Sequence, residues 1–563
     1  MSKKYDVCIV GSGAGAGPVI YELSKAGFKV AVLEKGPWYR TKDLTKDEIT
    51  AVRRSVYTPN LEDEPQVLEE QTEDGNWEAE STFSSGNNFW NGSCVGGSSN
   101  FMSGYFFRMK PNDFQLHSKY GEIDGANIVD WPISYEDMEP WYTKVEEVVG
   151  ISGNAKAHRF KEPRSTENFP YPPLVENIIS EHLDKASEKL GYEMIPTPRA
   201  ILSQPRERRN ACYYSNYCGS YGCSSDAKGS ARVALVREAL LSGNCTVIPN
   251  AKVFHLETDG NKKIVKANYY DAAGTRQSIE AGTFIVAAQA VETSRLLLMS
   301  KNKEFPNGLA NNQGQVGKNL LFSAGGVGGG YLYARDFDKK TFEEFMRPGV
   351  FVNRSIHHFY EYEDEKSGKR IKGGAIDFLF EHANSMTRAI KQKWDNRDHL
   401  LYGTTYKKHL SSYFKDLRKI KFEVFADWTP TDQCYIQLDP KVKDKWGDPV
   451  ARIRTGYHPH DIEVGRYLAK KGEAVLKQLG AKDIAWSVSG DPPSNLQAGG
   501  CRFGTDPKNS VLDPNCKAHE VKNLYVTDGS FMPTGGSVTY TWTIYANAFR
   551  VAAHLLEVLK RGN

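Results

Sequence analysis

The segment from Tyr5 to Glu34 constrains the fold more than any other part of the chain. It holds a short apolar run at Val7–Val10, a glycine-rich turn, a helical segment at Pro18–Ala26 and a second apolar run at Val30–Leu33. This order of strand, turn, helix and strand is typical of a dinucleotide-binding unit, in which a helix N-terminus faces the phosphates. The sequence therefore predicts an α/β fold with a Rossmann-type domain.

Individual residues of this segment have different predicted roles. Gly11 permits a tight turn, and Gly13 leaves room for a pyrophosphate to approach the backbone. Ala16 is small enough for the helix to pack closely on the strand, and Glu34 can accept hydrogen bonds from a ribose. The motif alone does not separate FAD from NAD. Its place at the start of a long chain favours FAD, whose domain is often completed by distant segments.

The length, the net charge and the distribution of apolar residues exclude several classes of protein. A length of 563 residues predicts two or more domains, or one discontinuous domain with insertions. The 72 basic and 69 acidic residues give a net charge of +3, so we expect no nucleic-acid partner. No apolar run approaches the roughly 20 residues of a membrane span. The N-terminus does not resemble a signal peptide, so we expect a cytoplasmic protein, or a periplasmic one if a partner subunit carries it.

Six separated segments of the chain resemble one family in their content and their order. They are Val10–Gly17, Val95–Asn100, Ile285–Ser300, Val316–Leu320, Gly499–Gly504 and Asn523–Pro533. Together they are similar to the glucose–methanol–choline oxidoreductases, which bind FAD through an N-terminal Rossmann unit and oxidise alcohols. The resemblance implies a discontinuous FAD-binding domain and an antiparallel-sheet domain that covers the flavin and binds the substrate.

The resemblance and the N-terminal motif together nominate a set of FAD-binding residues. A second glycine–serine loop would lie along the flavin, Val253 would reach the adenine, and Asp528 would lie near the ribityl chain or pyrophosphate. The predicted cofactor residues are Gly11, Gly13, Ala16, Glu34, Gly97, Ser98, Asn100, Val253 and Asp528. The second loop has no histidine, so we expect FAD to be bound non-covalently.

The segments divide the chain into five predicted parts. The FAD-binding domain takes residues 1–130, 206–329 and 491–563, a helical lobe with linkers takes 131–205, and the substrate domain takes 330–490. Within the first part, the charged stretch Thr41–Glu80 is predicted to form surface helix and loop. Within the substrate domain, Phe422–Trp428 and Cys434–Pro440 have β-type composition and are assigned to the substrate sheet.

Three cysteines at close spacing form a second candidate site. Cys212, Cys218 and Cys223 lie in a loop rich in Gly, Tyr and Ser. Three sulfurs without an obvious fourth ligand favour a three-ligand cluster over a tetrahedral zinc site. The loop is similar to that of the glucose, fructose and gluconate dehydrogenases, some of which hold a [3Fe–4S] cluster. This resemblance implies electron transfer to a small subunit, a cytochrome or a quinone; the alternative is three free cysteines in a structural loop.

The acid–base pair that the family places beside the flavin is missing. Relatives carry a histidine where this chain has Leu496, and a second histidine or asparagine where it has Thr539. Leucine cannot take a proton, and a threonine hydroxyl is a very weak acid or base at neutral pH. The candidates that remain around these positions are Asn495, Gln497, Thr539 and Tyr540.

Three interpretations stay open at this point. The base has moved, to one of these candidates or to the substrate domain, and the protein oxidises a CH–OH group of a sugar, polyol or glycoside. Alternatively, it dehydrogenates a carbon that a carbonyl already activates, which requires no hydroxyl base. In the third interpretation it is a flavin-binding electron carrier or a catalytically silent subunit.

Overall fold

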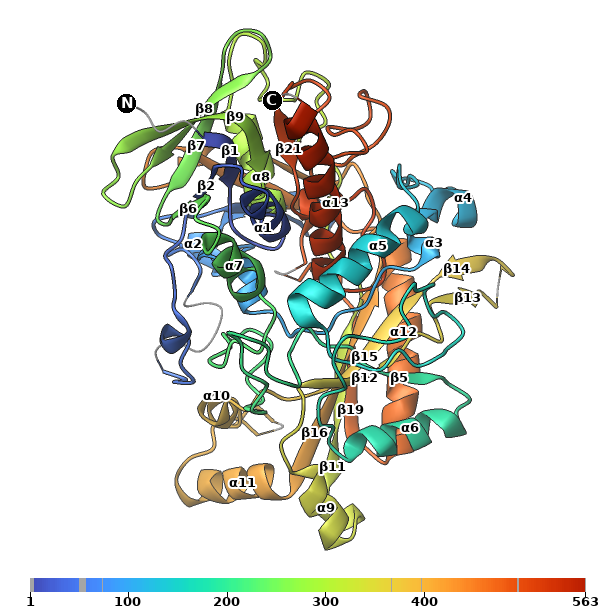
Figure 1. Cartoon of the computed structure of the whole chain (residues 1–563). Coiled ribbons are helices and arrows are strands. Elements are labelled where there is room, and N and C mark those ends of the chain that lie inside the picture. Colours follow the sequence, from blue (N-terminus) through green and yellow to red (C-terminus); the bar gives the residue numbers. More distant parts are fainter. Residues whose placement is uncertain are drawn as a thin grey trace.

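Two large β-sheets organise the molecule, one around the N-terminal strand and one from the middle of the chain (Figure 1). The computed structural model describes residues 5–49, 57–72, 74–365, 367–395, 397–493 and 496–561. The C-terminal helix α13 (Tyr540–Arg561) packs against α1 (Gly17–Lys25) and α5 (Tyr135–Val145). Both the predicted α/β class and the predicted Rossmann-type domain are confirmed.

Strands from three distant parts of the chain build the nucleotide-binding sheet. The parallel strands, in spatial order, are β6 (Cys245–Ile248), β2 (Val30–Leu33), β1 (Tyr5–Val10), β9 (Arg276–Val286) and β21 (Leu524–Val526). The first half of β9 also pairs antiparallel with β8 (Ile264–Tyr270), which pairs with β7 (Lys252–Thr258). The domain is therefore discontinuous in sequence, because its first and last strands are more than 500 residues apart.

The turn between β1 and α1 has the geometry that its glycines predict. Gly11 has φ +95°, and a Cβ atom there would lie 2.3 Å from the carbonyl oxygen of Ala287. Only glycine combines this φ with so close a neighbour. The turn leads into α1, where Pro18 occupies the first turn of the helix and needs no N–H partner.

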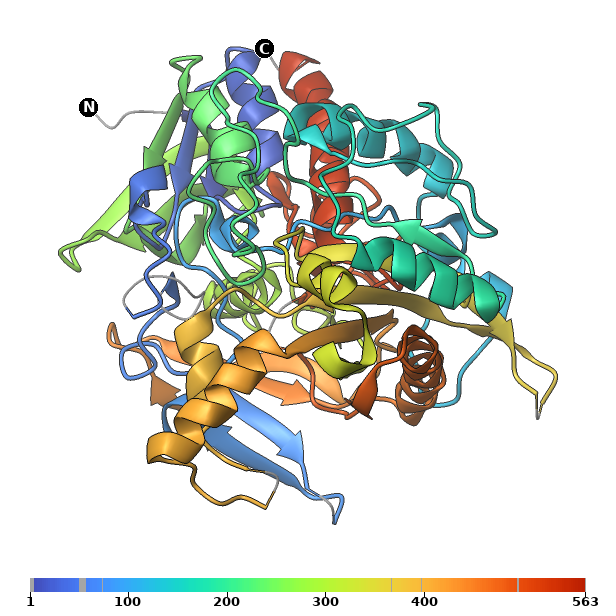
Figure 2. The same cartoon turned by 90° about the horizontal axis from the view of Figure 1, so that it is seen from below.

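The second sheet is antiparallel and has six strands, which confirms the predicted antiparallel-sheet domain. Their spatial order is β19 (Lys482–Ser487), β11 (Val327–Tyr333), β16 (Leu417–Ala426), β15 (Gly374–Phe380), β12 (Val352–Ile356) and β5 (Met194–Pro196). Side chains alternate between its two faces. Ile376, Phe378 and Phe422 join the main core on the face that α12 (Pro459–Leu479) covers. Figure 2 shows α12 lying alongside this sheet.

The opposite face of this sheet packs on a separate, smaller cluster. Ala375, Leu379 and Phe425 lie there with Tyr105, which belongs to the nucleotide-binding half of the chain. This face therefore looks toward the first sheet and forms the boundary at which the two halves meet.

Two sequence predictions about strands were wrong. The stretch Thr41–Glu80 contains the strands β3 (Val67–Gln71) and β4 (Trp77–Ser81), and not only surface helix and loop. They form a four-stranded sheet in the order β17 (Cys434–Lys443), β18 (Pro449–Thr455), β3 and β4. The segment Cys434–Pro440 therefore lies in this sheet and outside the six-stranded one.

A distant charge pairing explains why β3 was not recognised. Val67 and Leu68 are buried, and the Glu69 carboxylate accepts a hydrogen bond from Arg454 Nε at 2.8 Å. Arg452, also on β18, contacts the same carboxylate. The charges that made the stretch look like a surface loop are therefore neutralised by residues almost 400 positions away.

Shorter elements complete the described structure. The remaining longer helices are α6 (Ile179–Lys189), α8 (Ala290–Met299), α9 (Lys339–Phe345), α10 (Ser385–Lys391) and α11 (Gly403–Lys415). Helices α10 and α11 lie at the lower left of Figure 1, away from α12. Among the described residues, the helices all lack the combination of length and apolar character needed to cross a membrane.

Candidate active site

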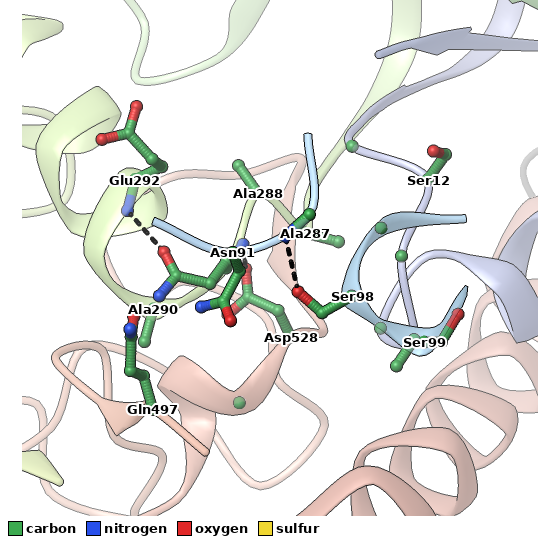
Figure 3. Close-up of a pocket in the computed structure, with 18 of the residues that line it drawn as sticks. Ser12, Asn91, Ser98, Ser99, Ala287, Ala288, Ala290, Glu292, Gln497 and Asp528 are labelled. Atoms are coloured by element: carbon green, nitrogen blue, oxygen red, sulfur yellow. Dashed lines mark hydrogen bonds between the residues drawn. The ribbon is translucent and has the colours of Figure 1, made fainter. Parts of the chain in front are cut away.

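A single cavity collects most of the predicted cofactor residues (Figure 3). It is lined by the turn after β1, the end of β2, the second glycine–serine loop, the start of α8 and the C-terminal segment before α13. The lining includes Gly11, Gly13, Glu34, Gly97, Ser98, Val253 and Asp528. The first and last of these residues, Gly11 and Asp528, are more than 500 positions apart, so the fold assembles the site.

Two predicted cofactor residues lie outside the cavity lining. Ala16 is fully buried where α1 begins. The Asn100 amide donates to the carbonyl oxygens of Val95 and Gly97, both at 3.0 Å, and so holds the glycine–serine loop in shape. Their direct contact with a cofactor stays a prediction, whereas their positions behind the cavity wall are clear.

The cavity wall consists of backbone where two glycine loops meet. A Cβ atom on Gly97 would lie 3.1 Å from the Cα of Gly13, and one on Gly15 would lie 2.5 Å from the Cα of Asp528. Side chains at these positions would fill the space or push the loops apart. The arrangement suits a pyrophosphate, because its charge can be met by backbone N–H groups at the start of α1.

Glu34 marks the nucleotide end of the cavity. Ser12 Oγ donates to Glu34 Oε2 at 2.6 Å, and the Gly36 backbone N–H donates to Oε1 at 2.9 Å. Burial raises the pKa of Glu34, and these two donors oppose that shift. Ser12 Oγ also accepts from the Gly96 N–H at 3.0 Å, so it links the two glycine loops. Sequence reasoning missed Ser12, which occupies a variable position inside the motif.

Asp528 holds the middle of the cavity wall together. Its Oδ2 accepts hydrogen bonds from the Gln289 N–H at 3.0 Å and from Thr293 Oγ1 at 2.5 Å. Gln289 has φ +81° and ψ 149°, a region that residues other than glycine rarely adopt. Its own side-chain oxygen accepts from two N–H groups in the first turn of α8. No sequence signal could have shown this strained residue, because its conformation depends on Asp528.

The predicted catalytic residues lie at the other end of the cavity. Leu496, Gln497, Thr539 and Tyr540 all line it. Asn495 lies outside the described residues. The C-terminal segment and the start of α13 therefore bring together the positions that the sequence nominated.

The polar groups at this end are engaged with backbone carbonyls. Thr539 Oγ1 donates to the Tyr105 carbonyl oxygen at 3.2 Å, and Gln497 Nε2 donates to that of Phe89 at 2.9 Å. The buried Tyr540 hydroxyl donates to the carbonyl oxygen of Phe322. An acid–base role for any of these side chains stays a prediction. Each of the three hydrogen bonds also stabilises the local fold.

The three cysteines lie together beside this end of the cavity. Cys212, Cys218 and Cys223 are half-buried against one apolar cluster of four residues. Cys218 also packs on the cluster that contains Tyr105. Within the described ranges, no three His, Cys, Asp or Glu side chains are arranged to hold a single metal ion.

Positive charges surround the cysteine loop. Lys46, Arg199 and Lys228 each lie within electrostatic reach of at least two of its sulfurs. Burial raises the pKa of the Cys212 thiol to about 11. Burial also opposes ionisation of Cys223, but the Lys228 charge and local hydrogen bonds outweigh it and lower that pKa.

Comparison with known proteins identifies the family. The two GMC oxidoreductase family models match residues 78–323 and 430–548. The chain is 29% identical to a 2-methyl-1,2-propanediol dehydrogenase of Mycolicibacterium austroafricanum, over 98% of this chain and 95% of that protein. It is 28% identical to the fructose dehydrogenase large subunit of Gluconobacter japonicus, over 83% and 81% respectively.

A solved structure shows the same fold. Pyridoxine 4-oxidase from Mesorbium loti superposes with a TM-score of 0.63 at 16% identity, covering 98% of this chain and 99% of that one. The matches to the family models, the two glycine loops and the cavity that they line all indicate the same family. The chain therefore belongs to the GMC oxidoreductases and is an FAD-dependent oxidoreductase of that family.

Proposed function

We propose that the protein is a dehydrogenase that oxidises a CH–OH group of a sugar, polyol or glycoside. The observation that carries the proposal is the cavity itself, which is lined by Glu34 and also by Leu496 and Thr539 beside the six-stranded sheet. Relatives of similar length are named for a diol and for fructose, which supports a substrate with several hydroxyl groups.

Different residues along the cavity would bind the cofactor and the substrate. Bound FAD supplies the chemistry of hydride acceptance. Gly13 and Gly97 would leave room for the cofactor, and Glu34 would hold its ribose. The apolar Leu496 would lie beside a substrate bound at this end of the cavity. Since neither Leu496 nor Thr539 can accept a proton at neutral pH, another group must take the hydroxyl proton.

We propose that electrons then leave through a [3Fe–4S] cluster on Cys212, Cys218 and Cys223. Each thiolate of such a cluster binds a different iron atom, so the sulfurs need not converge on one point. The positions of the three sulfurs in one apolar patch, beside three cationic side chains, support a cluster that is negatively charged with its thiolates. The contact of Cys218 with the Tyr105 cluster places this loop next to the cavity.

An exposed apolar region suggests where an electron-accepting partner binds. Large side chains with 48–80% exposure gather on and around α10 and α11: Met386, Ile390, Trp394, Leu400 and Tyr402. Such a concentration is unusual for a free surface. Glu48 connects this region to the cysteine loop, because its carboxylate accepts from Tyr217 Oη at 3.2 Å and from the Thr387 N–H at 3.1 Å. We propose that a small subunit or a cytochrome binds here. The complex would lie in the cytoplasm or in the periplasm.

An anaerobic titration tests the proposed reaction. The purified holoenzyme is mixed with D-glucose, D-sorbitol, methyl β-D-glucoside or 1,2-propanediol, and the visible flavin band is followed. Bleaching by one class of compound is expected. If no compound bleaches a flavin that dithionite still reduces, the protein is not an alcohol dehydrogenase for these classes. It would then carry out other redox chemistry or only transfer electrons.

A further inference from the structure

Tyr105 stands between the two positions at which relatives carry their acid–base pair. Its side chain packs in the same apolar cluster as Leu496, and its carbonyl oxygen accepts the hydrogen bond from Thr539 Oγ1 at 3.2 Å. It also lines the cavity. A phenol side chain therefore lines the end of the cavity where a substrate hydroxyl is expected.

The other ionisable side chains that line the cavity are committed elsewhere. Glu34 accepts hydrogen bonds from Ser12 and Gly36, and Lys35 forms an ion pair with Glu64. Arg295 forms ion pairs with Glu292 and Asp444, and Lys252 pairs with the same Asp444 carboxylate. Among the described lining residues, this leaves two carboxyl or phenol groups besides Tyr105.

These two groups are also occupied. Asp528 accepts hydrogen bonds on both of its oxygens. Tyr540 donates its hydroxyl hydrogen to a backbone carbonyl, which cannot take up a proton at neutral pH. Tyr105 differs from both, because its hydroxyl donates to a carboxylate.

That carboxylate belongs to a pair of neighbouring acidic residues on the six-stranded sheet. Tyr105 Oη donates to Glu423 Oε2 at 3.0 Å. Glu423 on β16 lies directly opposite Asp377 on β15, so both side chains stand on the face that looks toward the cavity. Asp377 is fully buried and accepts a hydrogen bond from Ser355, which lies directly opposite it on the neighbouring strand β12. Arg199 lies within electrostatic reach of both Asp377 and Tyr105.

We propose that Tyr105 and Glu423, with Asp377 behind them, form the proton relay that replaces the missing histidine. The inference rests on the proposed alcohol oxidation. The substrate O–H bond breaks as its proton passes to Tyr105 Oη, and the phenol's own proton passes to Glu423 Oε2. The electron pair of the substrate C–H bond leaves as hydride to FAD, so the alcohol carbon becomes a carbonyl. Glu423 is partly exposed and can then release the proton to solvent.

Both members of the relay are necessary for chemical reasons. Burial and the nearby carboxylates raise the pKa of Tyr105 well above its usual value, so the phenol is not itself a base. A carboxylate that accepts the phenol hydrogen lets Tyr105 take a proton and give one at the same time. Two carboxylates side by side favour holding one proton between them, which suits an acceptor that must later release it. Tyr105 is the catalytic residue, Glu423 the acceptor and Asp377 a positioning residue.

Substitutions separate the relay from a structural role. We compare Tyr105→Phe, Glu423→Gln and Glu423→Asp with the matched control Tyr120→Phe. Tyr120 also donates to a carboxylate, that of Glu361 at 2.8 Å, but it does not line the cavity. The rate of anaerobic flavin reduction is measured with the four probes named above, together with FAD content and dithionite reduction for each variant.

Loss of the relay should cost roughly 100- to 10,000-fold in the rate of flavin reduction, the usual contribution of general acid–base catalysis. Tyr105→Phe and Glu423→Gln should show this loss with full FAD content, and Glu423→Asp should recover part of it. The wild-type rate should fall as the pH drops and the pair becomes protonated, and this fall should be absent in Glu423→Gln. Tyr120→Phe should match the wild type.

A measurement without turnover tests the pair directly. Infrared spectra of the substrate-free holoenzyme should show a carboxyl band that titrates near pH 7, because burial raises the pKa of Asp377 to about 7. Asp377→Asn should remove this band, Glu423→Gln should shift it, and the comparable band of Asp461 should remain in both. The groups that face the pair are Tyr105, Arg199 and Ser355, and none of them absorbs as a carboxyl.

The outcomes distinguish this inference from the proposed function. If the wild type is reduced by an alcohol and Tyr105→Phe is reduced equally fast, the relay is wrong and the alcohol oxidation stands. If no probe reduces the wild type, the proposed function fails and the relay fails with it. If the Asp377 band is absent, Asp377 holds no proton beside Glu423, and its assignment as a positioning residue of the relay is wrong.

Discussion

The buried Asp377 carboxyl should make the stability of this protein depend on pH in a way that one substitution removes. Burial raises the pKa of Asp377 from 3.8 to about 7 in the folded state. Each pKa unit corresponds to about 1.4 kcal/mol, so the shift corresponds to about 4 kcal/mol. Because the folded state holds the proton more tightly, this stabilisation is complete below about pH 4 and is lost as the pH rises to about 7.

The substitution Asp377→Asn keeps the shape of the protonated carboxyl and can still accept the hydrogen bond from Ser355. The variant carries no proton to lose, so its stability relative to wild type should rise by about 4 kcal/mol between pH 4 and pH 8. Unfolding entropy is about 2 cal/mol/K per residue, so for 563 residues unfolding as one unit this equals about 3 °C in Tm.

The assay is the thermal melting of wild type and variant across this pH range, at constant ionic strength. Titrating groups that do not interact with Asp377 act equally on both proteins and cancel in the difference. Glu343, with its side chain 66% exposed, supplies the control Glu343→Gln, which should follow the wild type at every pH. A Tm difference between Asp377→Asn and wild type that stays constant from pH 4 to pH 8 would refute the assigned burial and its electrostatic cost.

Three further predictions test other parts of the site. Gly97→Ala places a Cβ 3.1 Å from the Cα of Gly13 at a φ of +53°, so the purified variant should contain less than a tenth of the wild-type FAD, measured by absorbance after gel filtration. Cys218→Ser should lose the iron and the broad visible absorbance of a cluster while it keeps FAD; unchanged iron content would contradict the cluster. Tyr540→Phe leaves the Phe322 carbonyl without its hydroxyl donor and should destabilise the protein by about 1–3 kcal/mol, seen as a lower Tm. The same variant should keep the wild-type rate of flavin reduction, and a loss of 100-fold or more would instead make Tyr540 the acid–base group.

Local sequence was sufficient wherever neighbours in the chain decide the structure. The predicted strand at Val7–Val10, helix at Pro18–Ala26 and strand at Val30–Leu33 correspond to β1, α1 and β2, with boundaries within two residues. Their apolar periods and glycines act over a few positions, so the pattern is visible without the rest of the fold.

Prediction failed where a distant partner changes what a residue needs. The charges of β3 looked solvent-exposed, yet Glu69 is buried between arginines of β18. The β-type composition of Cys434–Pro440 was recognised, but composition does not specify which sheet a strand joins. Gln289 takes a conformation that is unfavourable in isolation, and only Asp528 and the start of α8 make it stable.

The sequence alone determined the nucleotide-binding motif, the family and the absence of the usual acid–base pair, because each of these depends on the identity of residues at short spacing. Only the tertiary structure brought Tyr105 to Glu423, which lies 318 positions further along the chain, and put Asp377 beside them. That convergence depends on the register of β15 against β16 and on how their sheet packs on the nucleotide-binding half. A shift of one residue in the register would turn the carboxylates to the opposite face. No local sequence pattern could therefore have predicted that they meet Tyr105.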